Sequence, residues 1–292
     1  MSTELTDERI RARAPLSAGE RFRLILAHVA VYIAAALFML PLVYAFFSAL
    51  KPNGEMFAMP PRLIGAELRW SNFAEVFKFG PFWTYIWNSL FVAVAGTLVV
   101  LFVSTTAGYA FGRLRWKGRD AVFIAFLATL MVPAEVLVIP MFQVMQWFGW
   151  VDTFRALIFP FAFGAFGTFL MRQFYRGIPY ELEEAARVDG AGPIRTFVRI
   201  LLPLSKSAMA VLAVFTFLSF WNSYLWPLIV TVDYNAHGTL PVGLATFSGQ
   251  TGTRWDLQMA ASIISMVPTT LLVIVLQKHL IKGIAMSGMG GR

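Results

Sequence analysis

Six long apolar segments alternate with shorter polar stretches along the chain. They cover about residues 24–50, 86–111, 121–147, 153–171, 208–232 and 259–281. Most of them exceed the roughly 20 residues that an α-helix needs to cross the hydrocarbon core of a bilayer. None shows the alternation of apolar and polar residues that is typical of strands in an outer-membrane barrel. The pattern therefore predicts an all-α membrane protein with six transmembrane helices.

The composition supports this interpretation. Of the 292 residues, 58% are hydrophobic and 14% are charged, whereas about a quarter of the residues of a soluble domain are charged. The chain has no cysteine, which excludes disulfides and thiolate metal sites. Its three histidines, His28, His237 and His279, are far apart in the sequence and form no ligand pair. We therefore expect this chain to bind no metal and no cofactor.

The net charge of +8 is distributed unevenly between the polar stretches. If the N-terminus is placed in the cytoplasm, eighteen lysines and arginines fall on the cytoplasmic side and six on the opposite side. Membrane proteins keep such an excess of Lys and Arg in their cytoplasmic loops. The sequence therefore predicts that both the N- and C-termini are cytoplasmic. The same asymmetry accounts for the basic composition without a nucleic-acid partner.

A polar segment, YELEEAARVDGAGPIRTFVRILLPLSK (residues 180–206), separates the fourth apolar segment from the fifth. Pro179 suits the first position of a helix, and Gly190 is typical of a helix C-terminus. Three acidic residues would meet the positive helix end in between: Glu181, Glu183 and Glu184. Two neighbouring small side chains, Ala185 and Ala186, would permit close approach of a partner's backbone. The segment thus predicts a short helix that docks against another protein.

A second helix is expected to begin at Pro193 and to end or bend at Pro203. Five apolar residues recur in it at helical spacing and form a stripe: Ile194, Phe197, Val198, Leu201 and Leu202. On helix physics alone, an interfacial loop that only joins two spans is an equally good interpretation of residues 180–206.

Seven positions of this segment match the signature E-A-A-x3-G-x9-I-x-L-P, which belongs to permease subunits of bacterial ATP-binding cassette (ABC) importers. The matching residues are Glu184, Ala185, Ala186, Gly190, Ile200, Leu202 and Pro203. The chain therefore resembles that family, whose members have the type I ABC importer permease fold. The resemblance implies that the segment is the coupling helix, which sits in a groove of a separate ATPase subunit. It further implies that these residues, together with Asp189, contact that subunit.

Three further stretches resemble the carbohydrate-uptake branch of the family. They are MRQFYRGIPYELEEAARVDGAG (residues 171–192), FWNSYLWPLIV (residues 220–230) and VPAEVLVIPMFQVM (residues 132–145). The span count and a long first external loop resemble the smaller permease of the maltose/maltodextrin or glycerol-3-phosphate type. The implied function is an ATP-driven, binding-protein-dependent importer of sugars, in which this chain forms half of the translocation path.

The resemblance also implies a set of partners and a domain organisation. The expected partners are a homologous second permease, two ATPase subunits that hold ATP-Mg, an extracytoplasmic solute-binding protein and the lipid bilayer of a bacterial inner membrane. Residues 1–23 would form a cytoplasmic tail, and residues 24–292 a multi-pass permease domain. The core shared with the family covers about residues 88–281, and the coupling loop covers residues 172–206.

The chain itself lacks the motifs of an enzyme. A phosphate-binding P-loop needs a Gly-Lys step, and none of the six lysines follows a glycine. H-E-x-x-H and G-x-S-x-G motifs are also absent from the sequence. We therefore expect ATP hydrolysis to occur on partner subunits. A permease for a non-sugar solute is the first alternative. An ion-coupled secondary transporter is the second, although it would need paired charges within the spans.

Polar or helix-breaking residues within membrane spans are candidates for the translocation path. The candidates are Glu135, Gly164, Gly167, Trp221, Asn222 and Tyr224. Glu135 is the only acidic residue within a predicted span, and the Asn222 amide beside aromatic rings suits binding to sugar hydroxyls. Pro160 and the two glycines interrupt the fourth span. Ordinary helix packing through small residues and interhelical hydrogen bonds is the alternative for each of them.

Overall fold

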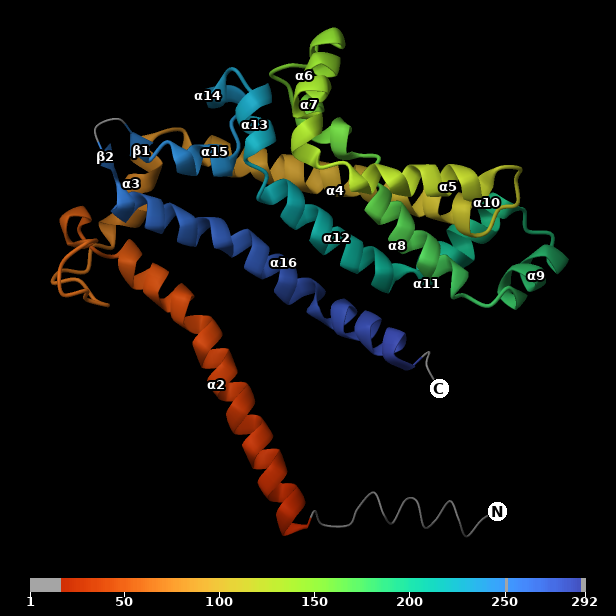
Figure 1. Ribbon diagram of the computed structural model, residues 1–292, viewed down its shortest axis with the longest axis horizontal. Coiled ribbons are helices and arrows are strands. Elements are labelled where there is room, and N and C mark those ends of the chain that lie inside the picture. The colour runs from red at the N-terminus through yellow and green to blue at the C-terminus, as the bar shows by residue number, and fades with distance from the viewer. Residues whose placement is uncertain (1–16, 250–251, 290–292) are drawn as a thin grey trace.

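The computed structural model describes residues 17–249 and 252–289, with side chains as far as residue 277 (Figure 1). Most of the predicted tail, residues 1–16, therefore lies outside the described residues. Helices account for nearly all of the regular structure in the described residues. The exception is a pair of two-residue antiparallel strands, β1 (Ser248–Gly249) and β2 (Gly252–Thr253). The prediction of an all-α fold is confirmed to this extent.

Three helices are individually long and apolar enough to cross a membrane: α2 (Ala18–Ala49), α4 (Phe82–Gly112) and the Trp255–Gln277 part of α16 (Trp255–Met289). Helix α2 begins six residues before the predicted apolar segment because Ser17 caps it. The Ser17 hydroxyl accepts a hydrogen bond from the Glu20 N–H at 3.3 Å, and the Glu20 carboxylate accepts one from the Ser17 N–H at 2.8 Å. This capping box satisfies two otherwise free N–H groups.

Three further segments have membrane length but are bent at a short break. The first joins α5 (Arg119–Ala128) and η2 (Thr129–Met131) to η3 (Ala134–Leu137) and α6 (Val138–Trp147), at 94°. The second joins α7 (Phe154–Ile158) and η4 (Phe159–Phe161) to α8 (Ala165–Arg176), at 45°. The third joins α10 (Pro193–Thr196), η5 (Phe197–Leu201) and α11 (Leu202–Leu204) to α12 (Lys206–Trp221), at 74°. If each bent pair is one span, the chain has up to six.

The predicted span over residues 121–147 is not one straight helix but two helical parts that meet at a bend. The chain turns at Val132, which has an extended backbone with φ −85° and ψ 119°. The following residue, Pro133, accounts for this, because the proline ring disfavours the helical conformation in the residue before it. Glu135 consequently lies at the bend, in η3, and its side chain is exposed.

The fifth apolar segment is likewise divided into two helices. Helix α12 ends at Trp221, and a separate helix, α13 (Leu225–Val230), follows after a short break. A helix that continued past Trp221 would bring the ring of Pro227 against the carbonyl group of Ser223, four residues earlier. Trp221 and Asn222 thus lie at the end of α12 and not inside a continuous helix over residues 208–232.

Short elements complete the described chain. Element η1 (Asn53–Glu55) and helix α3 (Ser71–Phe79) lie between α2 and α4, and helix α9 (Glu181–Val188) lies between α8 and α10. Helices α14 (Tyr234–His237) and α15 (Leu240–Ala245) precede the strands. Figure 1 shows α9 at one end of the elongated molecule, and α3, α15 and the strands near the other.

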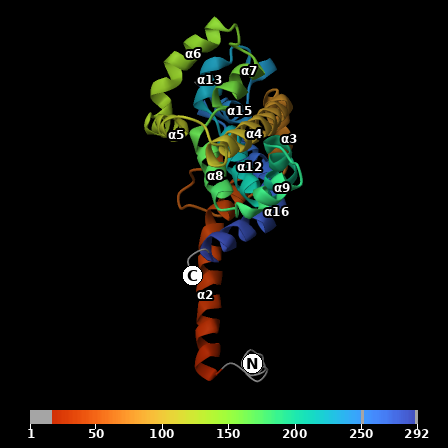
Figure 2. The ribbon, with the colours of Figure 1, turned by 90° about the vertical axis from the view of Figure 1, so that its right-hand side faces the viewer.

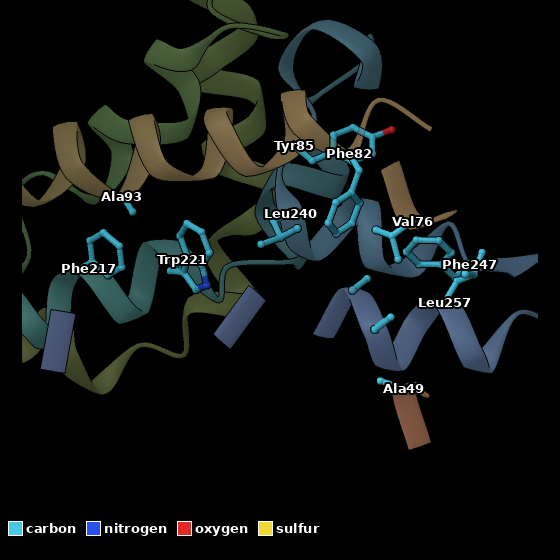
Figure 3. Close-up of a cluster of buried hydrophobic side chains, with 12 residues drawn as sticks. Ala49, Val76, Phe82, Tyr85, Ala93, Phe217, Trp221, Leu240, Phe247 and Leu257 are labelled. Carbon is cyan, nitrogen blue, oxygen red and sulfur yellow. The ribbon is translucent and has the colours of Figure 1, made fainter. Parts of the chain in front are cut away.

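Helix α4 is the central element of the fold, and α8 and α12 pack along it (Figures 1 and 2). In the described residues it contributes to three clusters of buried apolar side chains: Tyr85 belongs to the first, Tyr109 to the second and Val92 to the third. Figure 3 shows the first cluster, in which side chains of α4 meet those of α2, α3, α12, α15 and α16. By contrast, α2 leans away from the other helices, and nearly all of its side chains are exposed.

Candidate functional site

The polar segment folds as a short helix followed by a turn and a second helix, as predicted. The first helix, α9, begins at Glu181, and Tyr180 is its N-cap residue. The Tyr180 carbonyl accepts hydrogen bonds from the N–H groups of Glu183 and Glu184, at 2.9 and 3.1 Å. Pro179 precedes this cap, so the prediction that Pro179 is the first helical residue was wrong.

Gly190 ends α9, as predicted, by adopting a left-handed backbone with φ +74°. The Gly190 N–H donates to the Arg187 carbonyl at 3.0 Å, and the Ala191 N–H donates to the Ala186 carbonyl at 2.8 Å. This pair of hydrogen bonds is a Schellman motif, which satisfies the last free carbonyls of a helix. Pro193 then begins α10 at its first helical position, also as predicted.

Gly190→Val is expected to loosen the end of α9, because the left-handed conformation costs a residue with a side chain about 1–2 kcal/mol. Amide hydrogen exchange within α9 should become roughly 5- to 30-fold faster in the purified chain, in proportion to that cost. Gly192→Val is the matched control. Gly192 has φ −75°, and a Cβ atom there meets nothing within 4 Å. Equal exchange rates in the two variants would contradict the assignment.

Helix α9 presents one face inward and the other outward. Glu183 and Ala186 are buried, whereas Leu182, Glu184 and Ala185 are exposed. The prediction that Ala185 and Ala186 share a docking face was therefore wrong, because neighbouring residues on a helix point about 100° apart. Of these two alanines, Ala185 lies on the outer face and Ala186 on the inner face.

Residues 180–206 are polar overall, but the outer surface of α9 and α10 exposes large apolar side chains. Val188 is 88% exposed on α9, and Ile194 is 80% exposed on α10. We call the following residues the α9 face: Leu182, Glu184, Ala185, Val188, Asp189 and Ile194. Large exposed apolar side chains flanked by charges are typical of a protein–protein interface.

The predicted apolar stripe of the second helix is split between inside and outside. Phe197 and Leu201 are buried, whereas Ile194 and Val198 are exposed. The cause is that residues 197–201 form a π-helical turn, which departs from α-helical spacing. The motif residues that follow connect this turn to α12. Ile200 and Leu202 are half-buried there, and Pro203 is exposed.

Two buried charged side chains join α9 to the end of α4. Arg113 Nε lies 3.1 Å from Glu183 Oε1, and both side chains are almost completely buried. The contact is an ion pair rather than a well-aligned hydrogen bond. The Arg113 guanidinium also donates a hydrogen bond to the Ile178 carbonyl and lies 4.1 Å from the centre of the Tyr180 ring. Arg113 was not identified from the sequence, where it is one of several arginines after an apolar segment.

A second site is a cavity of about 260 Å³ that opens to the surface and is lined by residues of α4, η4, α8 and α12. Two of the predicted path residues, Gly164 and Gly167, line it. Three hydroxyl side chains also line it at spacings of three and four residues: Thr216, Ser219 and Ser223. This hydroxyl stripe was missed in the sequence, although hydroxyl groups at helical spacing within an apolar segment are a recognisable signal.

The other predicted path residues are not among those that line this cavity in the described part of the chain. Trp221 is buried, donates a hydrogen bond to the Ser265 carbonyl at 3.1 Å and stacks on Phe217. Its surroundings thus match the packing alternative. Asn222 and Tyr224 are exposed on either side of the break between α12 and α13.

Comparison with known families decides what kind of protein has these sites. Residues 104–286 match the family described as "Binding-protein-dependent transport system inner membrane component". The chain belongs to this family. The match includes most of both sites, since it covers the end of α4, all of α9 and the helices around the cavity.

The permease is similar to permease proteins of transport systems for sn-glycerol-3-phosphate and for arabinooligosaccharides. The "sn-glycerol-3-phosphate transport system permease protein UgpE" of Pectobacterium atrosepticum is 36% identical over 268 residues, which are 89% of this chain and 95% of that protein. The "Arabinooligosaccharides transport system permease protein AraQ" of Halalkalibacterium halodurans is 34% identical over 254 residues, which are 86% of this chain and 91% of that protein.

A solved structure supports the fold of the permease. A subunit of "a bacterial ABC transporter involved in the import of the acidic polysaccharide alginate" has a TM-score of 0.77 to this chain. The similarity covers 91% of this chain and 99% of that subunit, at 24% sequence identity. The permease therefore has the type I ABC importer permease fold, as the resemblance implied.

Proposed function

We propose that this permease is a transmembrane subunit of an ATP-driven, binding-protein-dependent importer of sugars or sugar-like solutes, and that α9 docks it to a separate ATPase. The observation that carries the proposal is the α9 face. It combines the family's signature residues with two exposed apolar side chains, Val188 on α9 and Ile194 on α10. The opposite side of α9 is joined to the end of α4 by the Arg113–Glu183 ion pair. The relatives that carry glycerol-3-phosphate and arabinooligosaccharides support the class of solute.

The proposed topology has six crossings, with both termini and the coupling loop (residues 172–206) in the cytoplasm. Three long helices and three bent pairs supply up to six crossings. An even number of crossings puts both ends of the chain on one side. The excess of Lys and Arg in the tail (residues 1–23) and in the coupling loop supports the cytoplasm as that side.

The proposed assembly contains a homologous second permease, two ATPase subunits that bind ATP-Mg and an extracytoplasmic solute-binding protein, in the inner membrane of a bacterium. The α9 face would sit in a groove of one ATPase. Closure of the ATPases around ATP would then move α9 and shift the helices between inward- and outward-facing arrangements. This chain would hydrolyse nothing itself and would form half of the path.

The cavity beside α8 and α12 is the part of the chain that best suits a path for sugars. Its hydroxyl groups can exchange hydrogen bonds with a sugar, and its phenylalanine rings can pack on C–H faces. Within the predicted set, Gly164 and Gly167 are the residues that this proposal uses. A path role for Glu135, Trp221, Asn222 and Tyr224 stays a prediction.

Uptake by the reconstituted system tests the function. The permease, its second permease and the ATPase subunits are placed in liposomes with ATP inside and the solute-binding protein outside, and uptake of labelled sugars is measured. ATP-dependent uptake of a sugar supports the proposal. Transport by this chain alone without ATP would favour a secondary transporter instead. ATP-driven uptake of amino acids but of no sugar would identify a permease for another solute.

Thr216→Val is expected to raise the KM for solute uptake by roughly 2- to 12-fold, because one hydrogen bond contributes about 0.5–1.5 kcal/mol. The substitution removes a hydroxyl from the cavity at nearly constant volume. Thr106→Val is the matched control, since the half-buried Thr106 hydroxyl donates to the carbonyls of Phe102 and Val103 in its own helix and does not line the cavity. An unchanged KM in the Thr216 variant would argue that the hydroxyl stripe does not bind the solute.

A further inference from the structure

The C-terminal end of α4 contacts the starts of both short helices, α9 and α10. The Tyr109 hydroxyl donates a hydrogen bond to the Pro193 carbonyl at 3.1 Å, at the start of α10, and its ring stacks on Phe197. One helical turn later, Arg113 binds Glu183 and the Ile178 carbonyl at the start of α9. Residues four apart lie on the same face of a helix. One face of α4 therefore fixes the entry to both short helices.

Simple stabilisation does not explain a buried ion pair at this place. Two charges lose their hydration when they are buried, and an apolar pair of similar volume often stabilises a fold equally well. What this arginine adds is a set of simultaneous contacts, because its planar guanidinium is always charged, donates a hydrogen bond to the Ile178 carbonyl and lies over the Tyr180 ring. The same guanidinium forms the ion pair with the Glu183 carboxylate, so one side chain holds Glu183, the Ile178 carbonyl and the Tyr180 ring together.

The position of Glu183 on α9 suits the transmission of force. It lies on the buried side, whereas Glu184, Ala185 and Val188 lie on the outer side. The covalent path from α9 back to α8 runs through residues 177–179, which are not helical. A push on the α9 face would therefore reach α4 directly through the Arg113–Glu183 ion pair. It would also reach α4 by way of α10, whose first residue is hydrogen-bonded to Tyr109.

We propose that the Arg113–Glu183 ion pair makes α9 and α4 move as one body, so that both residues are positioning residues for the coupling of ATP hydrolysis to transport. This inference rests on the proposed docking of α9 to an ATPase. Helix α4 contributes to all three buried clusters. Motion delivered at Arg113 is thereby passed to the cavity-lining helices, which pack along α4.

The test measures solute transported per ATP hydrolysed by the complete reconstituted complex, together with the amount of ATPase that co-purifies with the permease. Glu183→Gln removes the charge and keeps the shape. The variant should still bind the ATPase, because the α9 face is unchanged, whereas the transport-to-hydrolysis ratio should fall about 5-fold or more, the lower end of typical coupling between sites. Glu183→Asp, which keeps the charge, should recover part of the ratio. Glu181→Gln is the matched control on the exposed first turn of α9 and should behave as wild type.

A second variant keeps the inference testable if Glu183→Gln does not accumulate in the membrane. Arg113→Met combined with Glu183→Leu removes both buried charges at similar volume, so no lone charge opposes folding. It should bind the ATPase and show the same low ratio. A wild-type ratio of transport to ATP hydrolysis in the double variant would show that the ion pair contributes only packing, and it would overturn the inference. Loss of both ATPase binding and transport in the two variants would also overturn it. If the wild-type permease itself bound no ATPase, the proposed function would fail instead.

Discussion

Glu184→Lys is expected to abolish ATP-driven uptake while the permease still inserts into the membrane. Glu184 is exposed on the α9 face and makes no ion pair within the part of the chain that the structure describes. Its loss should therefore cost the fold little beyond the interaction of an acid with the helix N-terminus, about 0.3–1 kcal/mol. At an interface, loss of one partner of a buried charged contact costs about 2–5 kcal/mol, which lowers affinity by roughly 30-fold or more.

The measurement compares ATPase co-purification and sugar uptake in the variant with those in Glu181→Lys. Glu181 is a matched control, since it lies on the same helix, is equally exposed and is not part of the signature. The control should bind ATPase and transport nearly as well as wild type. Normal uptake by the Glu184 variant, or equal loss in both variants, would argue that α9 only joins two spans.

The features of the coupling segment that could be predicted from the sequence are local ones. Gly190 ends a helix because of its own backbone conformation, and Pro193 begins one because of its own ring. The signature residues follow one another within twenty positions and need no knowledge of the fold. The same holds for the apolar segments, since membrane length can be counted along the chain.

The features that could not be predicted depend on contacts between distant residues. Glu183 was interpreted as one of three acids at a helix N-terminus, because its partner Arg113 is 70 residues away in the sequence. Ala186 was placed on the docking face because nothing in the motif shows which side of α9 is buried. The 94° bend after α5 was missed because hydropathy is summed over a segment and contains no direction.

For the candidate translocation path, too, local features could be predicted and contacts between distant residues could not. Gly164 and Gly167 were selected as breaks in a helix. Gly164 lies at the break before α8, whereas Gly167 lies within α8, so that part of the prediction was wrong; both line the cavity. Trp221 was selected for its chemistry, yet its burial and its bond to the Ser265 carbonyl match ordinary packing. The cavity's own hydroxyl groups were missed, because residue type alone does not distinguish a lipid-facing serine from one that faces a cavity.

Gly108→Ala is expected to destabilise the permease strongly, although alanine normally favours a helix over glycine by about 1 kcal/mol. A Cβ atom at Gly108 would lie 2.6 Å from the Cβ of Met171 and 2.9 Å from the backbone nitrogen of Arg172. Neither atom can move without separating α4 from α8, so the substitution overpacks this contact. Overpacking of this kind costs about 1–3 kcal/mol.

Gly112→Ala, one turn further along the same helix, should have the opposite sign. The nearest atom to a Cβ there is the Arg172 carbonyl oxygen at 3.4 Å, which is an ordinary contact. The gain in helix propensity should then remain, and this variant should be at least as stable as wild type. Thermal unfolding of the two variants in detergent, with the yield of assembled complex, measures the difference. Equal melting temperatures would mean that α4 and α8 are not in close contact at Gly108. Helix α4 could then not transmit motion from Arg113 to the cavity through a tight contact with α8.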